Sequence, residues 1–170
     1  MRPAARRPSS HQPMPPKLLF DISNIDLDKV LYDKQAVREV NPQRGDMEHL
    51  DAIVHVDPAE HRIVGYKDVR DDEFWVPGHI PGRPLLPGVI MIESGAQLAS
   101  FYTKKVLGWQ GFIGFGGVNE VKFRQQVTPG CRMYILGQRI WERHRRICCN
   151  VQGIVRGELV FEAQILGTQM

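Results

Sequence analysis

The sequence predicts an α+β fold in which one antiparallel sheet wraps around a single central helix. Three observations support this prediction: runs rich in β-branched residues precede and follow one long apolar segment, that segment contains no proline, and the last run alternates apolar with polar side chains. A helix that is apolar on almost every side must be covered on every side, and a curved sheet achieves this best.

The central helix is predicted for residues 88–108. It follows a proline, carries two lysines in its last turns and stops at Gly108, as helices commonly do. From Val89 to Tyr102 the only charged residue is Glu93, so we expect this helix to be buried all round. These 14 residues are fewer than the ~20 that a membrane-spanning helix needs, and we expect no membrane span.

Short strands are predicted on both sides of this helix. Residues 51–57 and 61–69 are typical of a hairpin around the turn signal Pro58-Ala59-Glu60. We expect further hairpin turns at Glu142–Arg146 and at Arg156-Gly157. The remaining predicted strands cover residues 112–118, 119–127, 131–141, 145–155 and 158–166.

The length and composition predict one globular domain. A chain of 170 residues with 42% hydrophobic residues is large enough to bury its own core, which we assign to residues 18–170. Residues 1–17 contain five prolines, four basic residues and no acid, a composition that predicts a disordered tail. Residues 24–31 and 46–50 are weakly patterned, and we expect only short helices there.

The charge and the cysteines restrict the classes of partner and compartment. A net charge of +3 is too mild to indicate binding to nucleic acid, but it suits an acidic partner. The three cysteines form no evenly spaced disulfide framework, which favours a reducing compartment and a cytoplasmic location. His49, His55 and His61 share neither helical pairing nor a cysteine partner, so we expect no metal site.

Three groups in the segment GHIPGRPLLPGVIMIESGAQ, residues 78–97, suit acid–base chemistry. His79 lies in a loop whose prolines restrict the backbone and hold the imidazole in place. Gly88 begins the helix, where free N–H groups stabilise negative charge on a nearby oxygen. Glu93 is the lone acid of the apolar helix, and Gln97 at i+4 is placed to hydrogen-bond it.

Together these groups predict removal of a proton alpha to a carbonyl with departure of a beta hydroxyl. His79 would take the proton, the Gly88 amide would bind the developing enolate oxygen, and Glu93 would help the hydroxyl to leave as water. Taken singly, each group has a simpler interpretation: a loop histidine that satisfies backbone groups, a Pro-Gly turn, and an acid favoured by the helix dipole. Their joint spacing favours catalysis.

The same segment closely resembles the signature of the beta-hydroxyacyl-acyl-carrier-protein dehydratases of the FabZ and FabA type. In that family the working groups are a histidine, a glycine and an acid five residues after the glycine, and these match His79, Gly88 and Glu93. A glutamate at the acid position is typical of the FabZ type. The resemblance therefore implies a hot-dog fold and dehydration of (3R)-3-hydroxyacyl-acyl-carrier-protein to the trans-2-enoyl product.

The resemblance also implies partners and contacts. We expect a homodimer with shared active sites, in which histidine and acid come from different chains, and often a trimer of dimers. We expect Val89 and Gln97 to lie beside the substrate, with no cofactor. Arg83, Lys122 and Arg124 are candidates for docking the acidic acyl carrier protein, although exposed basic residues are more often simply solvated.

Departures from the family pattern leave the specificity open. Ile80 stands where the family has phenylalanine, Gln126 stands where relatives tend to have proline, and residues 72–78 read DEFWVPG. Acyl chain length and the pathway are therefore not predicted. Two other functions stay open: a hot-dog acyl thioesterase, which would release the free acid, and a non-catalytic acyl-binding module, which would release nothing.

Overall fold

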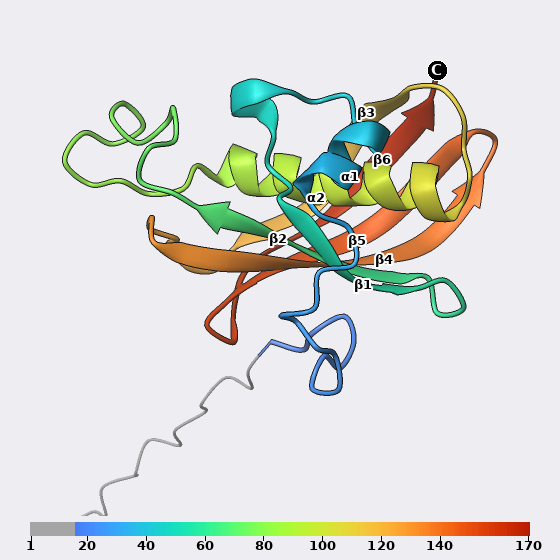
Figure 1. Cartoon of the computed structure of the whole chain (residues 1–170), viewed down its shortest axis with the longest axis horizontal. Helices are drawn as coiled ribbons and strands as arrows, with labels where there is room; N and C mark the ends of the chain where they lie inside the picture. The colour runs from blue at the N-terminus through green and yellow to red at the C-terminus, as the bar shows by residue number, and fades with distance from the viewer. Residues whose placement is uncertain (1–15) are drawn as a thin grey trace, which may run out of the picture.

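One antiparallel sheet forms the body of the protein (Figure 1). The computed structural model describes residues 16–170, so the expected disordered tail of residues 1–17 lies outside the described residues except for Pro16 and Lys17. Neighbouring strands follow the order β1-β2-β4-β5-β6-β3, which leaves β1 and β3 at the two edges. The strands are β1 (Ala52–Asp57), β2 (Arg62–Val69), β3 (Ile113–Phe123), β4 (Cys131–Arg143), β5 (Arg146–Val155) and β6 (Glu158–Gln169).

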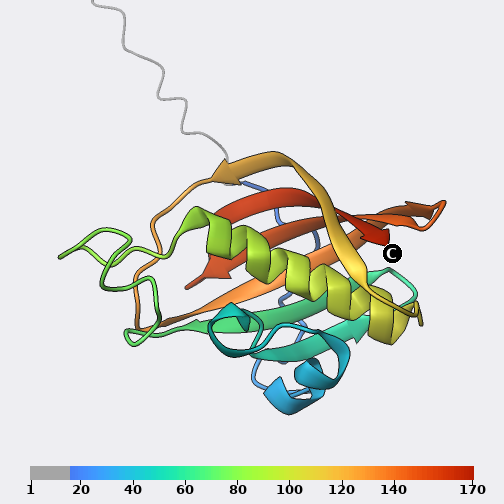
Figure 2. The ribbon, with the colours of Figure 1, turned by 90° about the horizontal axis from the view of Figure 1, so that it is seen from above.

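The helix α2 (Gly88–Phe101) lies across one face of this sheet, as Figure 2 shows. A π-helical turn, η2 (Tyr102–Val106), continues it, and Gly108 with φ +74° ends it. The main hydrophobic core lies between α2 and the strands, with Leu98 and Phe101 fully buried. The predicted α+β arrangement is confirmed, and so are both ends of its helix. Of the part that the structure describes, no helix is long and apolar enough to span a membrane.

The expectation that α2 is buried all round is wrong for a single chain. One face of the helix stays open: Val89 is 70% exposed, and Ile92, Glu93, Ala96 and Ser100 are partly exposed. These residues recur at helical spacing, so they form one continuous stripe along α2. An apolar stripe looks the same in sequence whether it contacts a core, a cavity or a second chain.

The hairpin turns of the sheet are where the sequence predicts them. His144, Arg145, Arg156 and Gly157 all have positive φ, which two-residue hairpin turns require. The two strands predicted for residues 112–127 are instead one strand, β3, with irregular pairing at Phe115/Gly117 and again between Asn119 and Lys122. Such bulges bend a strand without ending it, so the glycines and polar residues here mark bends and not a turn.

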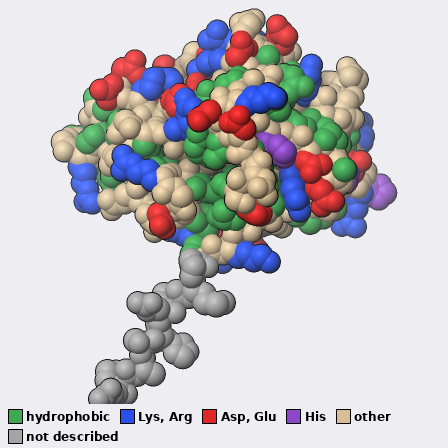
Figure 3. Space-filling view, turned by 60° about the horizontal axis from the view of Figure 1, so that its bottom comes forward, with side chains coloured by type: hydrophobic (Ala, Val, Ile, Leu, Met, Phe, Trp, Pro, Cys, Tyr) green, Lys and Arg blue, Asp and Glu red, His purple; other side chains and the backbone are tan. Residues whose placement is uncertain are grey.

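Residues 18–27 cover the outer face of the sheet, opposite α2 (Figure 1). Here a second hydrophobic cluster joins Phe20 to residues of β1, β2, β4 and β5. Residues 24–31 form turns and not the expected helix, because their apolar side chains pack irregularly on the sheet; the helix α1 (Lys34–Val40) begins later, capped by Asp33. Figure 3 shows that acidic, basic and hydrophobic side chains are interspersed on the face of the molecule turned toward the viewer. At 46–50 only a 3-10 turn, η1 (Gly45–Met47), forms.

Candidate active site

His79 lies in the loop 70–87, which projects beyond the sheet at the end where α2 begins (Figure 1). Its imidazole Nδ1 is 2.8 Å from the carbonyl oxygen of Leu85. Because a carbonyl oxygen only accepts, Nδ1 carries a proton and donates it, so that in the neutral ring Nε2 is the nitrogen with the free lone pair. The ring is exposed, so this free nitrogen is accessible to a substrate.

The first turn of α2 offers free amides close to this loop. The carbonyl of Pro87 accepts hydrogen bonds from the amides of Ile90 (3.0 Å) and Met91 (3.2 Å). The amides of Gly88 and Val89 come before these bonds, where a helix has no internal partner for them. A Cβ at position 88 would lie 2.6 Å from the ring of Phe123, so a larger residue here would push that ring aside. The predicted helix start at Gly88 is confirmed.

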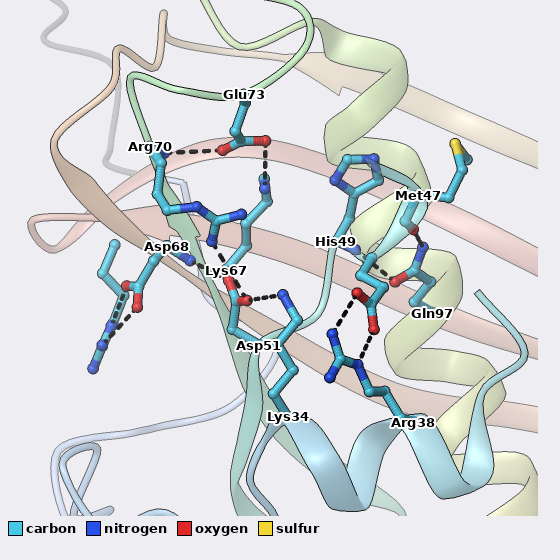
Figure 4. A network of polar contacts seen from close by, with 12 residues as sticks. Lys34, Arg38, Met47, His49, Asp51, Lys67, Asp68, Arg70, Glu73 and Gln97 are labelled. Carbon is cyan, nitrogen blue, oxygen red and sulfur yellow. Dashed lines mark hydrogen bonds and ion pairs between the residues drawn. The ribbon is translucent and has the colours of Figure 1, made fainter. Parts of the chain in front are cut away.

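Glu93 is held by the side chain of Gln97, as the i+4 spacing predicts. The Gln97 amide Nε2 donates to Glu93 Oε1 at 2.7 Å and to the carbonyl of Met47, also at 2.7 Å. Its Oε1 accepts from the backbone amide of His49 at 2.9 Å (Figure 4). Gln97 is therefore fully bonded and orients one oxygen of the Glu93 carboxylate. Sequence reasoning missed residues 47–49, which carry no recognisable signal because they act through backbone groups.

Glu93 opens onto a cavity of about 130 Å³ between α2 and the sheet. The cavity runs along α2 from Glu93 past Ser100 to Thr103, which is roughly 15 Å at 1.5 Å per helical residue. Its lining is mainly apolar, with small residues on the helix side; it includes Ala96, Ala99, Phe112, Phe115, Ile147, Cys149 and Ile165. Burial raises the pKa of Cys149 to about 12, which keeps this thiol neutral. Val89, Ile92 and Val118 line a second hollow on the other side of Glu93.

His79 and Glu93 do not meet within one chain. His79 lines neither hollow beside Glu93, and no hydrogen bond joins the two residues in the described part of the chain. The structure thus brings Glu93, Gln97 and Val89 together on α2 and presents His79 on a separate loop.

The three docking candidates differ in their surroundings. Arg83 is exposed and donates to the neutral Gln126 side chain at 3.0 Å. Lys122 and Arg124 both pair with Glu162 on the outer face of the sheet, at 3.6 and 2.7 Å. Burial alone would raise the pKa of Glu162, but the bond and charge of Arg124, the bond from Gln152 and the charge of Lys122 together lower it, so this carboxylate stays charged. Within residues 16–170, Arg83 is therefore the candidate that forms no ion pair with an acid.

This fold and this site define a hot-dog protein, and residues 41–164 match the family model of the FabA-like domain. The chain belongs to that family. It is 31% identical over 135 residues to the 3-hydroxyacyl-[acyl-carrier-protein] dehydratase FabZ of Desulfotalea psychrophila, which covers 78% of this chain and 89% of that protein. It is 33% identical over 141 residues to the enzyme of the same name from Erythrobacter litoralis, covering 79% of this chain and 93% of that protein.

A solved structure supports the fold. The dehydratase heterocomplex ApeI:P from Xenorhabdus doucetiae matches with a TM-score of 0.65 at 16% identity, over 79% of this chain and 90% of that chain. The predicted hot-dog fold and the FabZ/FabA resemblance are confirmed.

Proposed function

We propose that this chain dehydrates (3R)-3-hydroxyacyl-acyl-carrier-protein to trans-2-enoyl-acyl-carrier-protein in fatty acid biosynthesis, in the cytoplasm. The observation that carries the proposal is that two side chains are oriented for acid–base chemistry. The His79 imidazole is bonded through Nδ1 and leaves Nε2 free, and the Glu93 carboxylate is held by Gln97 in the lining of an apolar cavity. Family membership and the FabZ relatives support the same reaction.

In this reaction His79 Nε2 removes one proton from C2 of the substrate, and the electron pair moves into the thioester carbonyl. The amides of Gly88 and Val89 donate to the oxygen as it becomes enolate-like. Glu93, in its acid form, gives a proton to the C3 hydroxyl, which leaves as water while the C2–C3 double bond forms. The imidazolium and the carboxylate then exchange a proton through solvent, and no cofactor is needed.

The two groups would meet between two copies of the chain. β3 is an edge strand with unpaired backbone groups, and edge strands readily pair with another chain. Phe112, Phe115 and Phe123 on or beside it are each 53% exposed. A second copy that pairs along this edge would cover these rings and the open stripe of α2, and could bring its His79 loop to Glu93. We propose a homodimer with two shared sites, and a trimer of such dimers as its higher assembly.

The cavity beside Glu93 would hold the acyl tail. Ser100 lies seven residues beyond Glu93, or roughly 10 Å along the helix axis. We expect Ser100→Leu to leave turnover of short 3-hydroxyacyl substrates near wild type and to lower kcat/KM for long ones at least tenfold, because the added carbons fill the distal cavity. The measurement is a series of carrier-bound substrates of graded length. Ala96→Leu, one turn from Glu93, is the matched control and should slow every length; equal effects of Ser100→Leu on all lengths would contradict this use of the cavity.

The acyl carrier protein would dock where α2 begins, mainly on Arg83. We expect Arg83→Glu to raise KM for carrier-bound substrate roughly tenfold and to leave KM for the same acyl group on coenzyme A unchanged, because charge pairing with the acidic carrier is lost. Arg143→Glu, at the β4–β5 turn, is the matched charge control. A larger rise of KM for carrier-bound substrate in Arg143→Glu than in Arg83→Glu would contradict docking at Arg83 and indicate that the carrier docks at the β4–β5 turn.

One assay tests the whole proposal against the two other functions. Purified protein is given 3-hydroxyacyl-acyl-carrier-protein, and the products are separated by mass. Enoyl product supports the dehydratase. Free acid identifies a thioesterase, and acyl binding without any product identifies a binding module.

A further inference from the structure

A buried ion pair stands at the entrance of the loop that carries His79. Lys67 of β2 and Glu73 of the loop have side chains only 1% and 4% exposed, and Lys67 Nζ lies 2.7 Å from Glu73 Oε2 (Figure 4). Burying two charges costs several kcal/mol of hydration per ion, and a well-packed apolar pair often serves stability equally well. We therefore attribute the presence of this ion pair to the backbone geometry that it fixes at the start of the loop, and not to a gain in stability.

Both oxygens of Glu73 are used to shape the loop. Oε1 accepts from the backbone amide of Arg70 at 2.9 Å, and Oε2 accepts from the indole Nε1 of Trp75 at 3.0 Å as well as from Lys67. Burial by itself would raise the pKa of Glu73, but these three donors outweigh it and lower the pKa below its ordinary value. The carboxylate thus stays charged and joins the sheet, the start of the loop and the indole.

Trp75 connects Glu73 to His79, because its indole bonds to Glu73 and its carbonyl bonds to the backbone of His79. Its carbonyl accepts the amide of His79 at 2.8 Å and that of Gly78 at 3.3 Å, while its side chain is buried in the main core. The His79 ring itself bonds through Nδ1 to the Leu85 carbonyl, and the backbone amide of the next residue, Leu86, donates to the carbonyl of Val127 at 2.7 Å. The ring and its acceptor therefore belong to the two ends of the loop, one held through Trp75 and the other through Leu86 and Val127.

We infer that Glu73, with Lys67 and Trp75, is a positioning residue that fixes the backbone of His79 and so keeps the Nδ1–H form of its ring bonded to Leu85. The inference rests on the proposed role of His79 as the base. Glu73 touches no substrate in this arrangement. It acts through Trp75, whose indole it orients and whose carbonyl holds the amide of His79.

Two variants test this inference. Trp75→Phe removes the indole donor and keeps the ion pair; Glu73→Gln removes the charge. A displacement of about 1 Å at a reacting group can cost about 10²-fold in rate, so we expect kcat to fall about 10²-fold in Glu73→Gln and roughly tenfold in Trp75→Phe, with KM unchanged. The matched control is Asp68→Asn, which breaks the Arg132–Asp68 pair (2.7 Å) on the residue next to Lys67; successive strand residues point to opposite faces, so this change leaves the loop untouched.

A second readout does not depend on activity. The ¹⁵N spectrum of the His79 imidazole should report the Nδ1–H form in the wild type and in Asp68→Asn, and a mixture of both neutral forms in Trp75→Phe. Wild-type kcat and an unchanged His79 spectrum in Trp75→Phe, with only a lower melting temperature, would overturn the inference. If Trp75→Phe loses the Nδ1–H form while the wild-type protein itself makes no enoyl product, the positioning is supported and the proposed function is rejected, so the two failures are distinguishable.

Discussion

Replacing His79 by alanine should lower the rate of enoyl formation by about 10²–10⁴-fold, the usual worth of a positioned acid–base group. The free Nε2 of this ring is the only group of the loop that we place as the base, and the loss should appear in kcat and not in KM. The measurement is steady-state dehydration of a carrier-bound 3-hydroxyacyl substrate, with the melting temperature recorded for each variant. Because the side chain is exposed, its removal should leave the free energy of unfolding nearly unchanged.

His55→Ala is the matched control, since it removes an imidazole from β1, away from the loop and the cavity. It should retain wild-type turnover. Near-normal turnover in a folded His79→Ala protein would remove this residue from the role of base, and with it the mechanism proposed for the site.

Much of the fold could be predicted because local and tertiary preferences agree. The start of α2 at Gly88 follows from a proline and a glycine before an apolar run, and the alternation of Leu159, Phe161, Ala163 and Ile165 is matched by their burial in β6. The hydrogen bond between Gln97 and Glu93 follows from i+4 spacing.

Where the prediction is wrong, tertiary packing decides the outcome. Residues 24–31 have enough apolar side chains for a short helix, but they bury them on the outer face of the sheet in turns. In β3, polar residues and glycines read as a break between two strands, and only the pairing with β6 turns them into bulges. The sequence does hint at the Lys67–Glu73 pair, because a lysine inside the apolar run of β2 needs an acidic partner if it is buried. The sequence does not identify which acid that partner is.

The sequence alone predicts which residue types the site contains, but it does not predict how they are brought together in space. Residue types and spacing indicate a base, an oxyanion site and an acid, yet within one chain His79 lies on the loop before α2 and lines neither of the hollows beside Glu93. The open stripe of α2 and the exposed rings beside β3 are apolar surfaces that one chain leaves uncovered. Both would be costly to leave in water, and both are covered if a second copy completes the site.

Mixing two inactive variants should therefore restore activity. In a His79→Ala chain paired with a Glu93→Gln chain, one of the two shared sites carries both substitutions and the other carries neither. If subunits exchange at random, half of the dimers are mixed and each has one intact site, so about one quarter of wild-type turnover should return, far above either variant alone. The mixture is prepared by unfolding and refolding the two chains together at equal amounts.

The same mixture discriminates between shared and single-chain sites without any structure of the dimer. If both groups of each site came from one chain, every site in the mixture would carry one substitution and turnover would stay at the level of the parents. The control for refolding is a mixture of wild type with a chain that carries both substitutions. If the sites are shared, each mixed dimer then has one site without His79 and one site without Glu93, so neither site is intact. Recovery in the first mixture, together with silent mixed dimers in the second, is the pattern that only an exchange of His79 and Glu93 between subunits produces.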